Sequence, residues 1–133
     1  MANAAMDHAV DQGDAGLLGH VGPDGSKPHE RLARYGDVPG MSGEGIAYGK
    51  MDPVEVVLHL AIDDGIKSRC HRANIFNPVL RRFACFTNYH KAYQRVTVCT
   101  YAETFTIHEV ADVQKKVTQV EIDKWLKGLK EAE

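Results

Sequence analysis

Apolar residues recur at helical spacing near the N-terminus of the chain. Residues 1–18 form an alanine-rich segment typical of a short helix, and Gly13 and Gly16 predict its end. A second short helix is predicted over 29–35, where helix-forming residues precede a glycine. The glycine- and proline-rich residues 19–28 between these two segments predict a loop.

A third helix is predicted to begin at Asp52 and Pro53. Aspartate is a favoured N-cap residue, and proline is well tolerated at the first helical position because the amide hydrogen that it lacks has no partner there. We expect this helix to run to about Asp64, before Gly65. Three apolar residues at helical spacing are predicted to face the core: Val56, Val57 and Leu60.

Strand-forming residues dominate part of the second half of the chain. Residues 80–87 and 95–106 favour strands, and residues 88–92 between them have the length of a hairpin connection. Residues 68–78 are predicted to cross between elements, and residues 44–49 are too short and too rich in glycine for a regular element. The pattern therefore predicts one hairpin flanked by irregular segments.

The last segment, residues 107–133, is helix-prone. Valines recur at spacings of three and four residues, and Thr118 with Glu121 forms a capping-box pattern before an apolar stripe. A strand through 117–120 is an alternative that the pattern leaves open. The apolar stripe consists of Ile122, Trp125, Leu126 and Leu129. We interpret 107–133 as a helical C-terminal extension that either folds back over the core or docks onto another protein.

The composition of the chain mainly excludes classes of partner and of targeting segment. A chain of 133 residues is long enough for one domain, and 16 Lys and Arg against 18 Asp and Glu give a formal charge of −2. Because there is no excess of basic residues, we expect no nucleic-acid partner. No apolar run reaches the roughly 20 residues of a transmembrane segment. The first residues also lack the basic and apolar regions of a signal peptide.

The number and spacing of the three cysteines exclude two further classes of protein. Cys70, Cys85 and Cys99 are separated by 15 and 14 residues, which excludes a zinc ribbon and the disulfide-dense frameworks of small secreted proteins. One disulfide plus one free thiol, and three reduced thiols, are both compatible with this spacing. The seven histidines are many for this length, so they direct the search to a histidine-containing site.

Four stretches of the chain carry motifs. They are residues 20–26 (HVGPDGS), 31–36 (RLARYG), 42–49 (SGEGIAYG) and 62–76 (IDDGIKSRCHRANIF). In this order and spacing they resemble the CAP superfamily, which comprises the cysteine-rich secretory, antigen 5 and pathogenesis-related group 1 proteins, and its bacterial and protist branch in particular. Residues 101–105 resemble a late core strand of that branch. The resemblance covers about residues 5–106.

The resemblance implies both a fold and a candidate site. The implied fold is α+β, an α-β-α sandwich with a small antiparallel sheet between helix layers, over a CAP/SCP-like domain at residues 1–106. A shallow cleft is implied to hold two histidines and two acids, which here are His20, Glu44, Asp63 and His71. Asp64 competes with Asp63 for its place. His90 with Tyr93 resembles a turn motif of the branch and is expected to shape the hairpin.

The chain departs from the family pattern at three places. Gly45 stands where the family has asparagine, and Cys70 replaces the glycine before His71. The family's first helix, with its H-N-x-x-R segment, has no counterpart in the sequence, so the domain is interpreted as truncated at its N-terminus relative to the family. We therefore expect an apolar face that the C-terminal extension or a protein partner must cover, and we favour the partner.

The implied tetrad suggests metal binding. His20 and His71 would hold Zn²⁺ or another divalent metal, while Glu44 or Asp63 would either bind the ion or orient an imidazole ring. The alternative is a hydrogen-bonded cluster in which Glu44 accepts from imidazole N–H groups and holds the loops over the sheet. A nucleophilic Cys70 is disfavoured, because sequence neighbours on an irregular loop usually point apart.

These observations favour binding over catalysis. The leading hypothesis is a non-catalytic CAP-like module that binds a protein partner or a small apolar ligand. A metal-dependent hydrolase that uses the same tetrad, with metal-bound water as nucleophile, is the first alternative. A structural subunit of a larger assembly is the second. The resemblance implies secretion. The missing signal-peptide pattern is compatible with an intracellular protein or with a processed or truncated form of a longer one, so the sequence leaves the compartment open.

Overall fold

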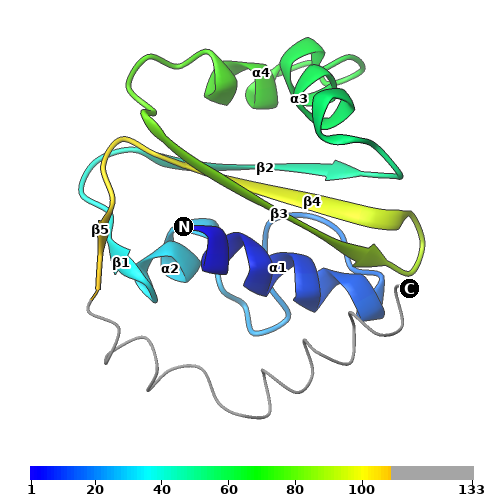
Figure 1. Ribbon diagram of the computed structural model, residues 1–133, viewed down its shortest axis with the longest axis horizontal. Helices are drawn as coiled ribbons and strands as arrows, with labels where there is room; N and C mark the ends of the chain where they lie inside the picture. Colours follow the sequence, from blue (N-terminus) through cyan, green and yellow to red (C-terminus); the bar gives the residue numbers. More distant parts are fainter. Residues whose placement is uncertain (109–133) are drawn as a thin grey trace.

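The computed structural model describes residues 1–108, and the predicted C-terminal extension lies outside the described residues from position 109 onward. Within this part, the central element is an antiparallel sheet of three strands in the order β2–β4–β3 (Figure 1). Its strands are β2 (Ser42–Tyr48), β3 (Arg82–His90) and β4 (Gln94–Ala102). A small second sheet pairs β1 (Gly36–Asp37) with β5 (Thr106–Ile107).

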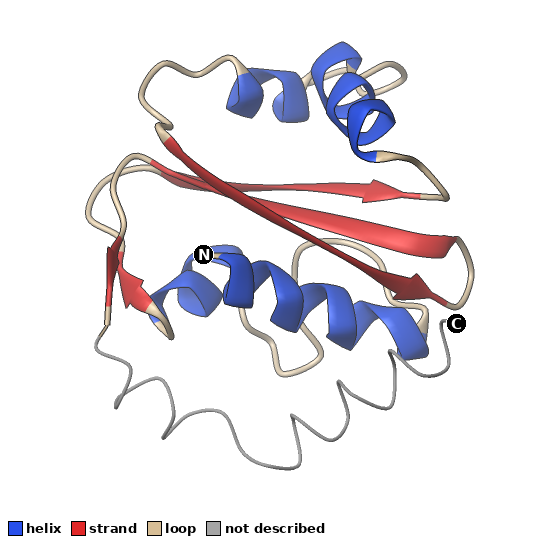
Figure 2. Ribbon diagram, in the orientation of Figure 1, coloured by secondary structure: helices blue, strands red, loops and turns tan. Residues whose placement is uncertain are grey.

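Helices cover both sides of the central sheet (Figure 2). On one side lie α1 (Ala2–Ala15) and α2 (Pro28–Ala33), and on the other lie α3 (Pro53–Ile62) and α4 (Cys70–Ile75). Within the described residues, no helix has the length and apolar character needed to cross a membrane. The fold is α+β, with the helix–sheet–helix layers that the resemblance implied.

The core is divided in two by the sheet. Side chains of the central strand β4 alternate between the two helix layers, so this strand is buried on both faces. The cluster on the α1 side contains Ala5, Ala9, Ile46, Val96 and Val98. The cluster on the α3 side contains Ala47, Val56, Leu60, Cys99 and Tyr101.

Small residues bring α1 close to the sheet. Gly13 lies inside the helix rather than at its end. A Cβ on this residue would be 2.4 Å from the carbonyl oxygen of Tyr89 on β3, so the close approach of the helix requires glycine here. The helix ends at Ala15, followed by Gly16 in the left-handed conformation with φ 66°. α1 packs on β3 and β4. This face of the sheet is therefore covered by α1, and the expectation that the C-terminal extension or a partner covers an apolar face stays a prediction.

The helix predicted from Asp52 and Pro53 is present as α3. The Asp52 side chain accepts a hydrogen bond from the Glu55 N–H at 2.9 Å, and the Glu55 side chain accepts one from the Asp52 N–H at 2.7 Å. Together they form a capping box that satisfies two amide groups at the start of the helix. The helix ends at Ile62, close to the predicted boundary.

The prediction for the buried face of α3 is right for two residues and wrong for one. Val56 and Leu60 are buried, but 49% of Val57 is exposed. Each residue rotates the helix by about 100°. Val56 and Leu60 are about one turn apart and share the inward face, whereas Val57 points to the side.

Two segments that we predicted to be irregular are regular elements. Residues 42–48 form β2, and residues 70–75 form α4. The glycines of β2 have a packing role, because a Cβ on Gly43 would lie 3.2 Å from the Asn74 side chain of α4. β2 is a strand because β4 pairs with all of it, from Ser42 to Tyr48.

The β3–β4 hairpin is tighter than predicted. β3 continues to His90, and β4 begins at Gln94. His90 is fully buried, and its Nδ1 accepts hydrogen bonds from the N–H groups of Ala92 at 3.2 Å and Tyr93 at 3.3 Å. Its Nε2 donates to the carbonyl oxygen of Leu17 at 2.9 Å. The prediction that His90 shapes the hairpin is therefore confirmed.

The cysteines adopt one of the two arrangements that the spacing allowed. Cys85 and Cys99 occupy facing positions on β3 and β4 and form a disulfide. Cys70 is exposed and has a free thiol.

Candidate functional site

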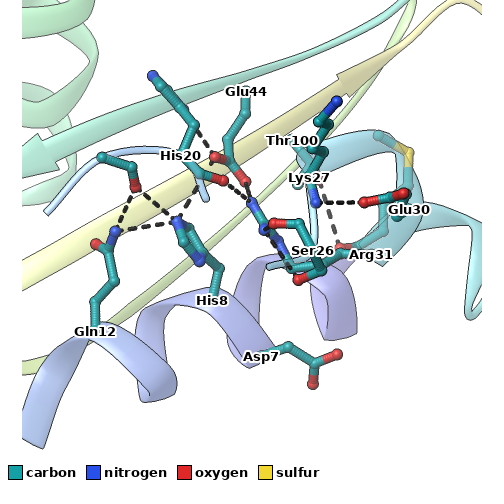
Figure 3. A network of polar contacts seen from close by, with 12 residues as sticks. Asp7, His8, Gln12, His20, Ser26, Lys27, Glu30, Arg31, Glu44 and Thr100 are labelled. Atoms are coloured by element: carbon teal, nitrogen blue, oxygen red, sulfur yellow. Dashed lines mark hydrogen bonds and ion pairs between the residues drawn. The ribbon is translucent and has the colours of Figure 1, made fainter. Parts of the chain in front are cut away.

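Glu44 is the centre of a buried polar network between β2 and the helices α1 and α2 (Figure 3). Only 1% of its side chain is exposed. Its Oε1 accepts a hydrogen bond from Nδ1 of His20 at 2.8 Å, and its Oε2 accepts one from Nη2 of Arg31 at 2.7 Å. A buried carboxylate is costly without a counter-charge, and the Arg31 guanidinium supplies one to Glu44.

Arg31 also holds the loop that carries His20. Its side chain is as buried as that of Glu44. It donates hydrogen bonds to the carbonyl oxygen of Ser26 at 2.8 Å and to that of His20 at 3.0 Å. One guanidinium therefore joins the acid of β2 to both ends of the 20–26 motif, and it fixes the position of the half-exposed His20 ring.

A second histidine, His8 of α1, extends this network. It is fully buried, with Nε2 2.8 Å from the carbonyl oxygen of Gly19 and 3.9 Å from Oε1 of Glu44. Gln12, one turn further along α1, contacts the same ring and accepts a hydrogen bond from the Tyr48 hydroxyl at 3.0 Å. Burial lowers the pKa of His8 below its usual value, against the smaller opposing effect of Glu44. His8 is therefore a neutral, structural member of the network.

Asp63 and His71 form a separate acid–histidine pair where α3 passes to α4. Oδ1 of Asp63 accepts from Nδ1 of His71 at 2.8 Å. Oδ2 accepts from the backbone N–H groups of His71 at 2.9 Å and Arg72 at 3.2 Å. Burial would raise the pKa of Asp63, but these hydrogen bonds from His71 and Arg72 bring it below its usual value. Asp64, the alternative acid, points outward with 90% of its side chain exposed.

The two acid–histidine pairs border opposite faces of β2. Successive side chains of a strand point to opposite faces, so Glu44 points toward α1 and α2 whereas Gly45 faces α3 and α4. His71 borders Gly45, because a Cβ on Gly45 would lie 3.6 Å from Cδ2 of the imidazole. The contacts thus group the four predicted residues as two pairs, and the sharing of one ion by His20 and His71 stays a prediction.

Both pairs present an imidazole in a form that suits a metal. His20 and His71 each donate Nδ1–H to a carboxylate, and among residues 1–108 neither Nε2 has a hydrogen-bond partner. A carboxylate behind the imidazole is a common means of orienting metal-binding histidines. Each imidazole therefore has the orientation of a ligand for Zn²⁺ or another divalent ion, which would act as a Lewis acid when bound, and metal binding by His20 and His71 stays a prediction.

Sequence reasoning missed three members of the Glu44 network: His8, Gln12 and Arg31. His8 lies outside the four motifs, and the 31–36 motif that contains Arg31 indicates no role for it. One signal was present, since His8 and Gln12 lie four residues apart on the same helix as the alanines of the core. A polar pair at that spacing on the inward face of a helix needs buried partners.

A solved structure shares this fold. The crystal structure of an extracellular protein containing a SCP domain from Bacillus anthracis str. Ames is similar to this chain with a TM-score of 0.59 and 20% sequence identity. The similarity covers 77% of this chain and 31% of that chain, so this chain spans less than a third of the length of that protein. At this identity the similarity supports the fold alone.

Sequence comparison supplies the family. A search of curated proteins gives no significant match. The sequence profile of the CAP, or cysteine-rich secretory protein, family matches residues 1–101, which is most of the chain. This chain therefore belongs to the cysteine-rich secretory protein family.

Proposed function

We propose that this chain is a non-catalytic interaction module of the CAP family that docks a protein partner on α3. The observation that carries the proposal is the outer side of this helix, which we call the α3 face. It consists of Val54, Val57, Leu58 and Ile62, which are between 49% and 67% exposed. Single exposed aliphatic residues are common on soluble proteins, but a contiguous apolar patch indicates an interaction site.

The form of the α3 face favours a protein over a small molecule. α3 lies beside α4 in an outer layer, on the opposite side of the sheet from α1 (Figure 1). Small ligands are held in concave pockets, whereas a helix in an outer layer presents a convex ridge. Aliphatic anchors three, four and eight residues apart on one helix are the pattern by which a helix docks into an apolar groove of a partner. The expected partner is therefore a protein with such a groove.

The state of the two acids supports binding rather than catalysis. Both oxygens of Glu44 are engaged by His20 and Arg31, and both oxygens of Asp63 are engaged by His71 and its helix. A general base must come within hydrogen-bond reach of the proton that it removes, and only 1% of each of these two side chains is exposed. These carboxylates instead hold other groups in place, which gives the hydrolase alternative less support than the interaction module.

The α3 face can be tested with a matched pair of variants. A photo-crosslinking amino acid at Leu58, introduced in the native host, should identify the partner, whose affinity for the purified full chain is then measured by calorimetry. Leu58→Asp should weaken binding at least about tenfold, which corresponds to about 1.4 kcal/mol. Ile107→Asp, which alters an aliphatic residue on β5 that is also exposed, should bind like the wild type.

Two results would contradict the proposal. One is a partner whose affinity is the same for the wild type and for Leu58→Asp. The other is a wild-type chain that forms a dimer in solution which Leu58→Asp dissociates, because the α3 face would then bind a second copy of the chain. Both variants should melt at the wild-type temperature, since the two side chains are exposed.

A second candidate function is divalent-metal binding by His20, Glu44, Asp63 and His71. It is supported by the two imidazoles, each oriented by a carboxylate through Nδ1. Calorimetric titration with Zn²⁺ tests it: His20→Ala and His71→Ala should each weaken binding if both rings hold one ion. Unchanged affinity in His20→Ala would remove His20 and Glu44 from the site.

A further inference from the structure

A different set of metal-binding side chains meets at the start of α4. We call it the α4 cluster, and it consists of Asp63, Cys70 and His71. One ligand atom of each residue lies within 4.8 Å of those of the other two. Cys70 is exposed and takes no part in the disulfide, so its sulfur is available to an ion. Thiolate, imidazole and carboxylate are the donor types that zinc uses in proteins.

Two of the three side chains are held in place before any ion binds. Asp63 is 2% exposed, and it ties the His71 ring and the first backbone amides of α4 together with hydrogen bonds of 2.8 to 3.2 Å. The adjacent cation Arg69 is directed elsewhere, since its guanidinium donates to the carbonyl oxygens of Ile62 and Asp63. Binding therefore requires the ordering of little more than the exposed Cys70 side chain, which lowers its entropic cost.

An independent observation points to a ligand at this place. Tyr101 is 3% exposed, and its hydroxyl is buried without a hydrogen-bond partner among the described residues. A Cβ on Gly45 would lie 3.3 Å from this hydroxyl and 3.6 Å from Cδ2 of His71. The unpartnered hydroxyl and the imidazole thus border the same space, beside the Cβ position that Gly45 leaves unfilled. A buried hydroxyl without a partner is unfavourable, so a polar occupant of that space would stabilise the fold.

We propose that the α4 cluster is a zinc site in which Cys70 and His71 bind the ion and Asp63 binds it or orients His71. On binding, the Cys70 thiol loses its proton to solvent and its sulfur forms a bond to Zn²⁺, with no change of oxidation state. The Tyr101 hydroxyl is the hydrogen-bond partner of a water molecule carried by the ion. The sulfur ligand favours zinc over magnesium or calcium, which prefer oxygen ligands.

This site does not need His20 or Glu44, and it depends on the cysteine that this chain has at position 70. The experiment is a titration of the full chain with Co²⁺ as a spectroscopic substitute for Zn²⁺, without reductant so that the Cys85–Cys99 disulfide stays intact. The wild type should develop the near-ultraviolet charge-transfer band of a thiolate bound to cobalt, and Zn²⁺ should abolish it. Cys70→Ser should lack the band, and His20→Ala should retain it.

Three results would overturn the site. They are the absence of the band in the wild type, its persistence in Cys70→Ser, and its loss in His20→Ala, which would place the ion in the four-residue cleft instead. Cys70 is exposed, and in His20→Ala the buried Glu44 keeps its ion pair with Arg31, so both variants should fold, which circular dichroism verifies.

A second measurement follows the thiol itself. Zn²⁺ should slow the alkylation of Cys70 by iodoacetamide in the wild type and in His20→Ala at least about tenfold. In His71→Asn this protection should largely disappear, because the imidazole that shares the ion is gone. Equal protection in His71→Asn and the wild type would show that zinc binds the exposed thiol without the α4 cluster.

Discussion

Replacing Arg31 with methionine should destabilise the protein more than any surface substitution. Arg31→Met keeps most of the side-chain volume but removes the charge that lies 2.7 Å from Oε2 of Glu44, and both side chains are only 1% exposed. It also removes the donors to the carbonyl oxygens of Ser26 and His20. Breaking a buried ion pair in this way costs about 3–5 kcal/mol. Because small domains are stable by only about 5–15 kcal/mol, the loss is a large fraction of the total.

The assay is equilibrium unfolding in urea, monitored by circular dichroism. Arg34→Met is the matched control, because Arg34 lies at the end of the same helix and pairs with Asp24 at 2.6 Å and Asp7 at 3.5 Å, but with 35% of its side chain exposed. A surface ion pair contributes at most about 1 kcal/mol, so this control should unfold close to the wild type. If Arg31→Met does not fold at all, the double variant described next still tests the argument.

The double variant Arg31→Met, Glu44→Leu should recover most of the lost stability. Replacing both members of a buried ion pair with apolar residues is often neutral or stabilising, because no charge is then left buried alone. The argument would be refuted by a cost for Arg31→Met below about 1 kcal/mol, or by a double variant as unstable as the single one. Either result would mean that the Glu44 carboxylate is not held by Arg31.

Three further predictions concern packing and pH. Leu60→Ala should cost about 2–5 kcal/mol in urea unfolding, whereas Val57→Ala should change stability by less than about 0.5 kcal/mol, and similar values for the two would contradict the assigned faces of α3. Gly13→Ala should destabilise the chain by about 1–3 kcal/mol, because the added Cβ meets the backbone oxygen of Tyr89 at 2.4 Å; a gain in thermal stability, as expected for an unhindered helical glycine, would show that α1 is not so close to β3. Burial lowers the pKa of His8 from its usual value of 6.5, so the unfolded chain is protonated at a higher pH than the folded chain. The contribution of His8 to the free energy of unfolding is therefore complete above about pH 6.5 and is lost as the pH falls toward the folded-state pKa. Unfolding free energies at about pH 7.5 and about pH 5.5 should therefore differ more in the wild type than in His8→Gln, and equal differences would show that His8 is not buried as a neutral ring.

The sequence by itself determined those elements whose cause is local. The start of α3 follows from Asp52, Pro53 and Glu55, because the capping box is made by groups three residues apart. β4 follows from its run of alternating side chains, which fit two apolar layers. The family follows from four motifs in register, since their order and spacing are properties of the chain.

Only the tertiary structure decided the elements that depend on a neighbour. β2 contains two glycines and has weak local preference for a strand, yet its pairing with β4 from Ser42 to Tyr48 makes it one. Gly13 carries the signal of a helix end, but the close approach of Tyr89 requires a glycine inside α1. In both places a long-range contact outweighs a local preference of about 1 kcal/mol per residue.

The candidate site likewise combines residues that the sequence implies with contacts that only the tertiary structure decides. The family resemblance implied His20, Glu44, Asp63 and His71 as candidates, but it could not say that they form two separate acid–histidine pairs or that Arg31 contacts one of them. Arg31 and His8 reach Glu44 from 13 and 36 positions away along the chain, when α2 and α1 pack beside β2. A buried carboxylate requires a counter-charge, and this requirement follows from elementary electrostatics. Which residue supplies it depends on how the layers pack, because hydrophobic and polar periodicity specifies the inward face of an element but not its neighbour across the core.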